Sequence, residues 1–128
     1  MIELSSRDRL IQTHIELRKE IEMEQSKIAA EYGIDMTFVT FEDEKILEES
    51  QIRDLQNELE PVVDKNKENQ LVLNFANVRF MTSAMLGLLV RIHKRVSERG
   101  GKLELRNLDS NLHKLFEITQ LTKIFDIT

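Results

Sequence analysis

The residues best suited to chemistry lie in one short segment, Met81–Gly87, where two hydroxyl side chains, Thr82 and Ser83, follow each other. Upstream, Gln70–Phe75 is a short apolar run typical of a buried strand, and downstream Leu86–Arg99 has the apolar spacing of a helix. A hydroxyl at the start of a helix accepts hydrogen bonds from free backbone N–H groups. A phosphate there would meet the same N–H groups and the positive end of the helix dipole. Ser83 is therefore a candidate helix cap, a candidate phosphorylation site, or both.

The candidate partner-binding surface consists of the residues around this serine: Met81, Thr82, Ser83, Ala84 and Met85. Phosphorylation would add a charge of about −1.5 to −2. The helix start tolerates that charge, whereas a partner packed over Met81 and Met85 does not. The two methionines are either filler of the core or an adaptable contact surface. Gly87 costs about 1 kcal/mol against alanine in a helix, which predicts close packing in the first turn.

Other chemical signals are weak. The chain contains no cysteine, which excludes disulfides, thiolate catalysis and zinc–thiolate sites. His14, His93 and His113 are isolated and lack the spacing of metal ligands. No P-loop or dinucleotide-binding fingerprint is present. We therefore expect no enzyme, no metal site and no cofactor.

Charge is distributed unevenly along the chain. Residues 1–70 carry a net charge of −9 and residues 71–128 a net charge of +4. The basic residues are modest in number, and aromatic residues make up only 5% of the chain, so nucleic acid is not an expected partner. Because charge polarity steers encounters between complementary faces, a protein partner fits better.

Length and composition predict one domain in the cytoplasm. A chain of 128 residues with 41% hydrophobic content can bury a single core. It contains no run of about 18 apolar residues, and its start lacks the pattern of a signal peptide. We expect no membrane contact.

The spacing of apolar residues in the first quarter of the chain predicts a helix over residues 6–24. Its apolar stripe comprises Leu10, His14, Leu17 and Ile21. So short a helix must bury this stripe, either on its own domain or, as the coiled-coil-like spacing slightly favours, against a second copy in a homodimer. We assign residues 1–25 to an N-terminal helical extension and residues 26–128 to the domain.

The rest of the chain alternates strands and helices. The stretch Lys27–Gly33 either ends the first helix or forms a first strand. Strands are expected at 36–41, 70–75 and 102–106, and helices at 52–62, 86–99 and from about 110. Pro61 predicts a kink or restart in its helix, and Asp109 or Ser110 caps the last one. The expected fold is an α/β mixed sheet of about four strands covered by helices.

Four segments in order resemble one known family. They are Phe41–Leu59, Asn74–Gly87, Gly100–Leu103 and Phe116–Ile127. Together they look like the STAS domain of bacterial anti-sigma factor antagonists, over roughly residues 35–128. The family's pattern Asp-Ser-Ser-Gly-Leu-Gly, whose first serine is phosphorylated, corresponds here to Thr82, Ser83, Ala84, Met85 and Leu86–Gly87.

The resemblance implies partner switching in transcription regulation. The antagonist would bind an anti-sigma factor that is also a serine kinase, and phosphorylation of Ser83 would break the complex. Thr82 replaces the aspartate of the pattern, as a similar hydroxyl-serine-alanine run does in several members. The alternative is a STAS scaffold or sensor subunit that is not phosphorylated and mediates homo- or hetero-oligomerisation. A small nucleotide-binding domain or enzyme has only the architecture in its favour.

Overall fold

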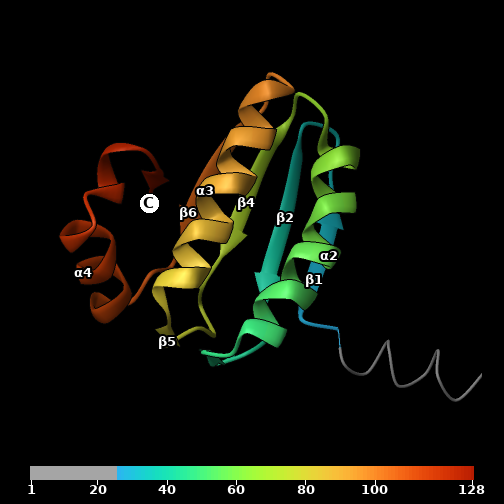
Figure 1. Ribbon diagram of the computed structural model, residues 1–128. Helices are drawn as coiled ribbons and strands as arrows, with labels where there is room; N and C mark the ends of the chain where they lie inside the picture. The colour runs from blue at the N-terminus through green and yellow to red at the C-terminus, as the bar shows by residue number, and fades with distance from the viewer. Residues whose placement is uncertain (1–25) are drawn as a thin grey trace, which may run out of the picture.

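The computed structural model describes residues 26–128 (Figure 1). Its elements are β1 Ile28–Tyr32, β2 Met36–Phe41, β3 Lys45–Ile46, α2 Glu49–Asn66, β4 Gln70–Asn74, β5 Phe80–Met81, α3 Ser83–Glu98, β6 Lys102–Arg106, α4 Ser110–Ile118, the 3-10 turn η1 Leu121–Lys123 and β7 Asp126–Ile127. The helix predicted over residues 6–24 lies outside the described residues.

Within residues 26–128 the strands form two sheets. The main sheet has the order β1-β2-β4-β6-β7, in which β1 and β2 are antiparallel and the other pairs are parallel. The two short strands β3 and β5 form a separate parallel pair. The expected α/β fold is confirmed, and the main sheet gains a fifth strand because the two-residue β7 is too short to show periodicity in the sequence.

The stretch Lys27–Gly33 is a strand and not the end of a helix. Its residues pair with β2 from Ile28 opposite Phe41 to Tyr32 opposite Thr37. The Gly33 N–H donates to the Met36 carbonyl at 2.7 Å and closes the hairpin. The alternative was open in the sequence because this run has neither a clear alternation nor a helical stripe.

The core lies between one face of the sheet and the helices α2 and α3, which run side by side over that face (Figure 1). Alternate sheet residues point into it, among them Val39, Leu73 and Leu105. Helix α2 adds Leu55 and Leu59. Burying these apolar side chains supplies the main driving force for the fold.

Helix α2 runs without interruption through Pro61. The predicted restart at this proline is wrong. Pro61 is exposed, and the fixed φ of proline suits a helix, so α2 continues despite the loss of one backbone hydrogen bond.

Candidate functional site

Ser83 is the first residue of α3 and its side chain is exposed. Strand β5 ends at Met81, so a single residue, Thr82, separates strand from helix. The predicted position of Ser83, at a strand-to-helix junction and open to solvent, is confirmed. Its predicted phosphorylation stays a prediction.

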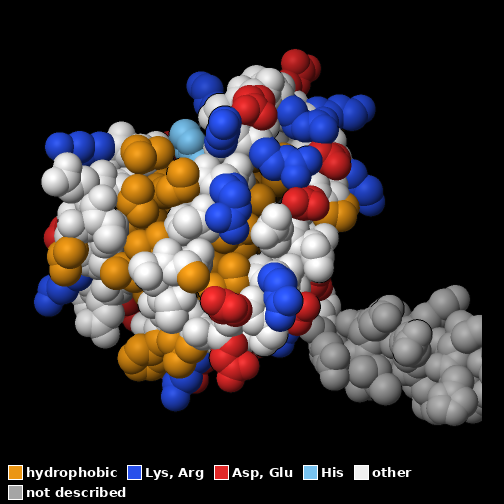
Figure 2. All heavy atoms as spheres, in the orientation of Figure 1, with side chains coloured by type: hydrophobic (Ala, Val, Ile, Leu, Met, Phe, Trp, Pro, Cys, Tyr) orange, Lys and Arg blue, Asp and Glu red, His pale blue; other side chains and the backbone are white. Residues whose placement is uncertain are grey.

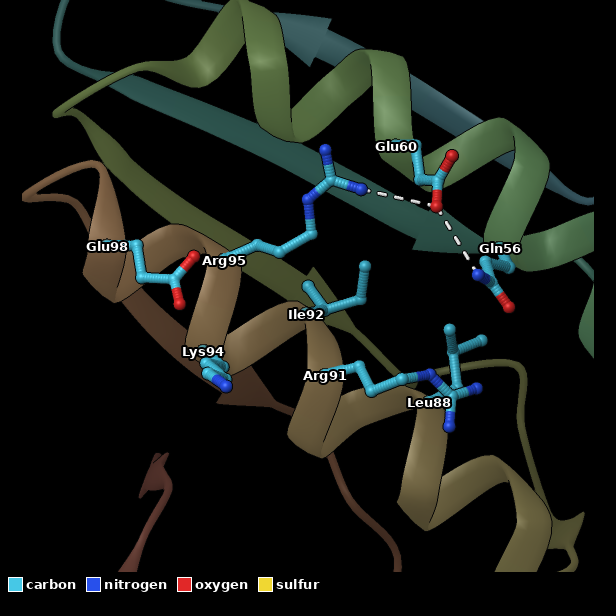
Figure 3. A pocket seen from close by; sticks show the side chains of 8 residues that line it. All are labelled: Gln56, Glu60, Leu88, Arg91, Ile92, Lys94, Arg95 and Glu98. Atoms are coloured by element: carbon cyan, nitrogen blue, oxygen red, sulfur yellow. Dashed lines mark hydrogen bonds and ion pairs between the residues drawn. The ribbon is translucent and has the colours of Figure 1, made fainter.

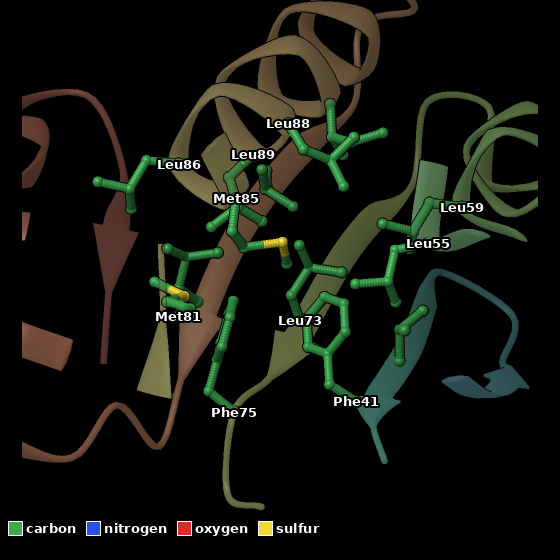
Figure 4. Packing of buried hydrophobic residues seen from close by; sticks show 14 of the residues in the cluster. Phe41, Leu55, Leu59, Leu73, Phe75, Met81, Met85, Leu86, Leu88 and Leu89 are labelled. Atoms are coloured by element: carbon green, nitrogen blue, oxygen red, sulfur yellow. The ribbon is translucent and has the colours of Figure 1, made fainter. Parts of the chain in front are cut away.

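The residues on either side of Ser83 anchor the junction in the core. Met81 is 9% exposed and Met85 is fully buried, and both lie among the apolar side chains below α3 (Figure 4). The Thr82 N–H donates to the Ile46 carbonyl at 3.2 Å, which ties the junction to β3. Of the two roles predicted for the methionines, the structure gives them that of core filler. Their side chains offer a partner almost no surface, and the exposed part of the predicted surface is Ser83 and Ala84.

The start of α3 has no side-chain cap. Thr82 occupies the N-cap position with an extended backbone, but its side chain makes no capping hydrogen bond. Its hydroxyl oxygen is buried and has no hydrogen-bond partner among residues 26–128. The Met85 N–H donates instead to the Thr82 carbonyl at 3.0 Å. The first amides of a helix lack partners inside the helix, so this end can receive an added acceptor.

Two apolar side chains beside this junction were missed by the sequence analysis. Leu47 is 49% exposed and Phe80 is 47% exposed. Phe80 lies in β5 opposite Lys45, and Leu47 is the residue that follows β3. Leu47 follows the buried Ile46, and Phe80 precedes the buried Met81. The strands β3 and β5 have two residues each, which is too short for alternating burial to be read from the sequence.

Gly87 does not pack closely against any neighbour in the described part of the chain. A β-carbon added there would meet only the tip of the Arg91 side chain, at 3.6 Å, which is an ordinary contact. The predicted close packing in the first turn of α3 is therefore wrong. By contrast, Gly101 does need its small size, because an added β-carbon there would lie 2.7 Å from the Asn69 carbonyl oxygen.

A hollow of about 330 Å³ lies between α2 and α3 (Figure 3). Leu88 and Ile92 form its floor, and charged residues form its rim. Arg95 pairs with Glu60 at 3.2 Å and with Asp64 at 3.6 Å, so much of the rim already serves to join the two helices. This arrangement is typical of a helix–helix seam.

The Glu104 side chain is buried on β6 and has several hydrogen-bond partners. Its carboxylate accepts from the Arg106 Nε at 2.8 Å, from the Thr128 hydroxyl at 2.8 Å and from the Gln70 amide. The hydrogen bond from Arg106, helped by Thr128 and Gln70, holds the pKa of the Glu104 carboxyl below its ordinary value and outweighs burial, which raises it. The cluster joins β4, β6 and the end of β7 and has a structural role.

The comparison with known families settles the relationship. The sequence profile of the STAS domain matches residues 17–128. The chain belongs to the STAS domain family. The match begins upstream of the region, roughly residues 35–128, in which the sequence itself carried the resemblance.

Among curated relatives, this STAS protein is 36% identical over 74 residues to the anti-sigma-B factor antagonist of Bacillus subtilis (strain 168). That match covers 58% of this chain and 66% of the relative's length.

Two solved structures illustrate the fold of this STAS domain. An anti-sigma-factor antagonist (STAS) domain protein from Planctomyces limnophilus has a TM-score of 0.72 at 16% identity, covering 78% of this chain and 87% of that one. The Bacillus cell fate determinant SpoIIAA, solved in its phosphorylated form, has a TM-score of 0.60 at 14% identity, covering 79% of this chain and 90% of that one.

The described part of this STAS domain contains no helix long and apolar enough to cross a membrane. Residues 26–128 also contain no group of three or more histidine, aspartate and glutamate side chains placed to hold a metal ion. The His93 and Phe125 rings form a T-shaped pair with their centroids 5.4 Å apart, and the His113 Nδ1 lies 2.9 Å from a Glu117 carboxylate oxygen. Both histidines thus have local structural neighbours, whereas His14 lies outside the described residues.

Proposed function

We propose that this STAS protein is an anti-sigma factor antagonist that binds an anti-sigma factor with serine kinase activity and is released when Ser83 is phosphorylated. The observation that carries the proposal is an exposed serine at the uncapped start of α3. A regulator of this kind acts where transcription takes place, so the proposal includes a cytoplasmic location and no catalytic role for the chain itself.

The helix start explains how a phosphate could change binding without unfolding the domain. The free N–H groups and the positive end of the α3 dipole favour a negative charge at Ser83. A partner that covers the same serine would have to strip water from a charge of about −1.5 to −2. Burial of an unpaired charge is costly, so the complex weakens while the free protein keeps its fold.

The name of the 36% identical relative supports the partner class, because that protein is an antagonist of an anti-sigma factor. The phosphorylated form of SpoIIAA supports phosphorylation as a state that this fold can accommodate.

The test uses the anti-sigma-B factor of Bacillus subtilis as the probe, with ATP. Intact-mass measurement should show one added phosphate on the wild-type chain and none on Ser83→Ala. Ser110→Ala is the matched control, because Ser110 is likewise an exposed first residue of a helix. Ser83→Asp should bind the probe at least tenfold more weakly than Ser110→Asp. Phosphate on Ser83→Ala, or equal affinity of both aspartate variants, would contradict the proposal and leave the non-phosphorylated STAS scaffold as the alternative.

We further propose a homodimer held partly by residues 6–24. The apolar stripe of Leu10, His14, Leu17 and Ile21 supports it through its coiled-coil-like spacing. Sedimentation of the full chain at tens of micromolar should give a dimer, and a chain starting at Gln25 should give a monomer. A full-length monomer, or a shortened chain that still dimerises, would show that this segment is not the dimer contact.

A further inference from the structure

The outer face of the β3–β5 pair carries exposed apolar side chains beside Lys45. Ile46 and Met81 lie opposite each other and point into the core. Their neighbours along each strand therefore point outward, since side chains alternate between the two faces of a strand. This places Phe80 of β5 on the solvent side, opposite Lys45. Leu47 is the residue that follows β3, and it and Phe80 are each about half exposed.

This apolar pair is continuous with the start of α3. Phe80 precedes Ser83 by three residues, and Thr82, which follows β5, is bonded through its N–H to the Ile46 carbonyl just before Leu47. Figure 2 shows hydrophobic side chains gathered at the end of the molecule where β5 lies in Figure 1. The Lys45 ammonium lies 5.6 Å from the centre of the Phe80 ring, so a positive charge lies beside this apolar side chain.

We propose that Leu47 and Phe80 form the apolar centre of the surface that binds the anti-sigma factor, with Ser83 at its edge. This inference rests on the proposed function and adds the residues that supply the binding energy. Met81 and Met85 are buried and cannot supply it, and Ser83 and Ala84 offer little apolar area. Interfaces draw most of their energy from a few large, well-buried side chains, and aromatic anchors are prominent among them.

The position of the pair explains why one phosphate suffices for release. A partner that buries Phe80 excludes water from the adjoining Ser83. A phosphate at the rim of an apolar contact must then lose its hydration or prevent closure of the interface. The exposed Ile34 does not share this position. It is 98% exposed but lies in the hairpin before β2, whereas β3 follows the far end of that strand.

The absence of native cysteine allows a clean footprinting test on the full chain. Single variants Leu47→Cys and Phe80→Cys, with Ile34→Cys as the matched exposed control, are alkylated alone and with saturating anti-sigma-B factor of Bacillus subtilis. All three should react rapidly in the free protein. The complex should slow alkylation at positions 47 and 80 at least tenfold and leave position 34 unchanged.

Affinity measurements complete the test. Phe80→Ser and Leu47→Ser should each weaken binding of the probe at least tenfold, and Ile34→Ser should not. Wild-type affinity of Phe80→Ser and Leu47→Ser, or unchanged alkylation of Phe80→Cys and Leu47→Cys in the complex, overturns the inference. The response to Ser83→Asp tests the proposed function separately. Slow alkylation already in the free protein also overturns it, because residues 1–25 or a second copy then cover the pair. A wild-type chain that does not bind the probe overturns both proposals.

Discussion

The starts of α3 and α4 have the same local plan but differ in how their backbone amides are satisfied. Each helix begins with a serine preceded by an extended residue, Thr82 for α3 and Asp109 for α4. The Asp109 carboxylate accepts from the Leu112 N–H at 2.9 Å. The Thr82 side chain caps nothing, and its hydroxyl is buried without a partner in the described part of the chain.

Helix α2 resembles α4, because a side chain accepts hydrogen bonds from backbone N–H groups at its start. The Gln51 side chain accepts from the Leu47 and Glu48 N–H groups at 3.0 Å each, on the turn that leads into the helix. Of the three helices in residues 26–128, only α3 begins without such a contact. A closed cap satisfies the amides at its own helix start, whereas the open amides at the start of α3 can donate to a hydrogen-bond acceptor or an anion.

In the sheet, the Glu104 carboxylate has hydrogen-bond partners for its buried charge. Among the predicted variants, we expect substitution of Glu104 to cause the largest loss of stability. Glu104→Gln removes the charge that Arg106, Thr128 and Gln70 donate to. Because the pKa of Glu104 is lowered in the folded state, its contribution is full above the pKa of the unfolded chain and is lost as the pH falls through the folded pKa.

Thermal unfolding of Glu104→Gln and wild type between pH 7 and pH 3 measures this effect. The gap in melting temperature should be widest near neutrality and should narrow below about pH 4. The exposed Glu68→Gln variant controls for the loss of one charge. A difference in melting temperature that stays constant over this pH range would contradict a stabilising role for the Glu104 charge.

Removal of the two cap side chains tests the comparison directly. Asp109→Ala should destabilise the domain by about 1 kcal/mol, as loss of a working cap does. Thr82→Val should cost nothing or stabilise, because it removes a buried hydroxyl that has no partner among residues 26–128. Urea unfolding measures the free energy of unfolding of both variants. An equal decrease in the two variants would mean that the two helix starts do not differ in capping.

Gly87→Ala should stabilise the protein by up to about 1 kcal/mol, since the added methyl group meets only the end of Arg91. Gly101→Ala is the contrasting variant and should destabilise, because the methyl group would collide with the Asn69 and Lys67 carbonyl oxygens. Urea unfolding measures both. A loss of stability in Gly87→Ala would contradict the open surroundings of Gly87 in the first turn of α3.

The smallest effect concerns added charge. Ser83→Asp should stabilise the free protein by about 0.3–1 kcal/mol through the α3 dipole and its open amides. Ser110→Asp should give no such gain, because Asp109 already caps α4 and a second carboxylate repels it. High salt should reduce the difference. Equal gains in the two variants would show that α3 has no special capacity for an anion.

The sequence predicted those parts of the molecule that have their own local pattern. The strands β2, β4 and β6, the three described helices and the exposed Ser83 all follow from apolar spacing and turn residues. The pairs made by β3, β5 and β7 could not be predicted, because strands of two residues have no period and exist only through distant partners. For the same reason the sequence missed Leu47 and Phe80 and left the methionines undecided.

The anchoring of Met81 and Met85 has a consequence for how fast and how selectively a partner can bind. With core contacts on both sides of Thr82–Ala84, this segment is held in one conformation before any partner arrives. Little conformational entropy remains to be lost on association, so the contact energy goes into affinity and not into ordering a loop. Under the proposed function, a phosphate on Ser83 would sit on a fixed segment and would act by changing the surface charge rather than by reshaping the surface.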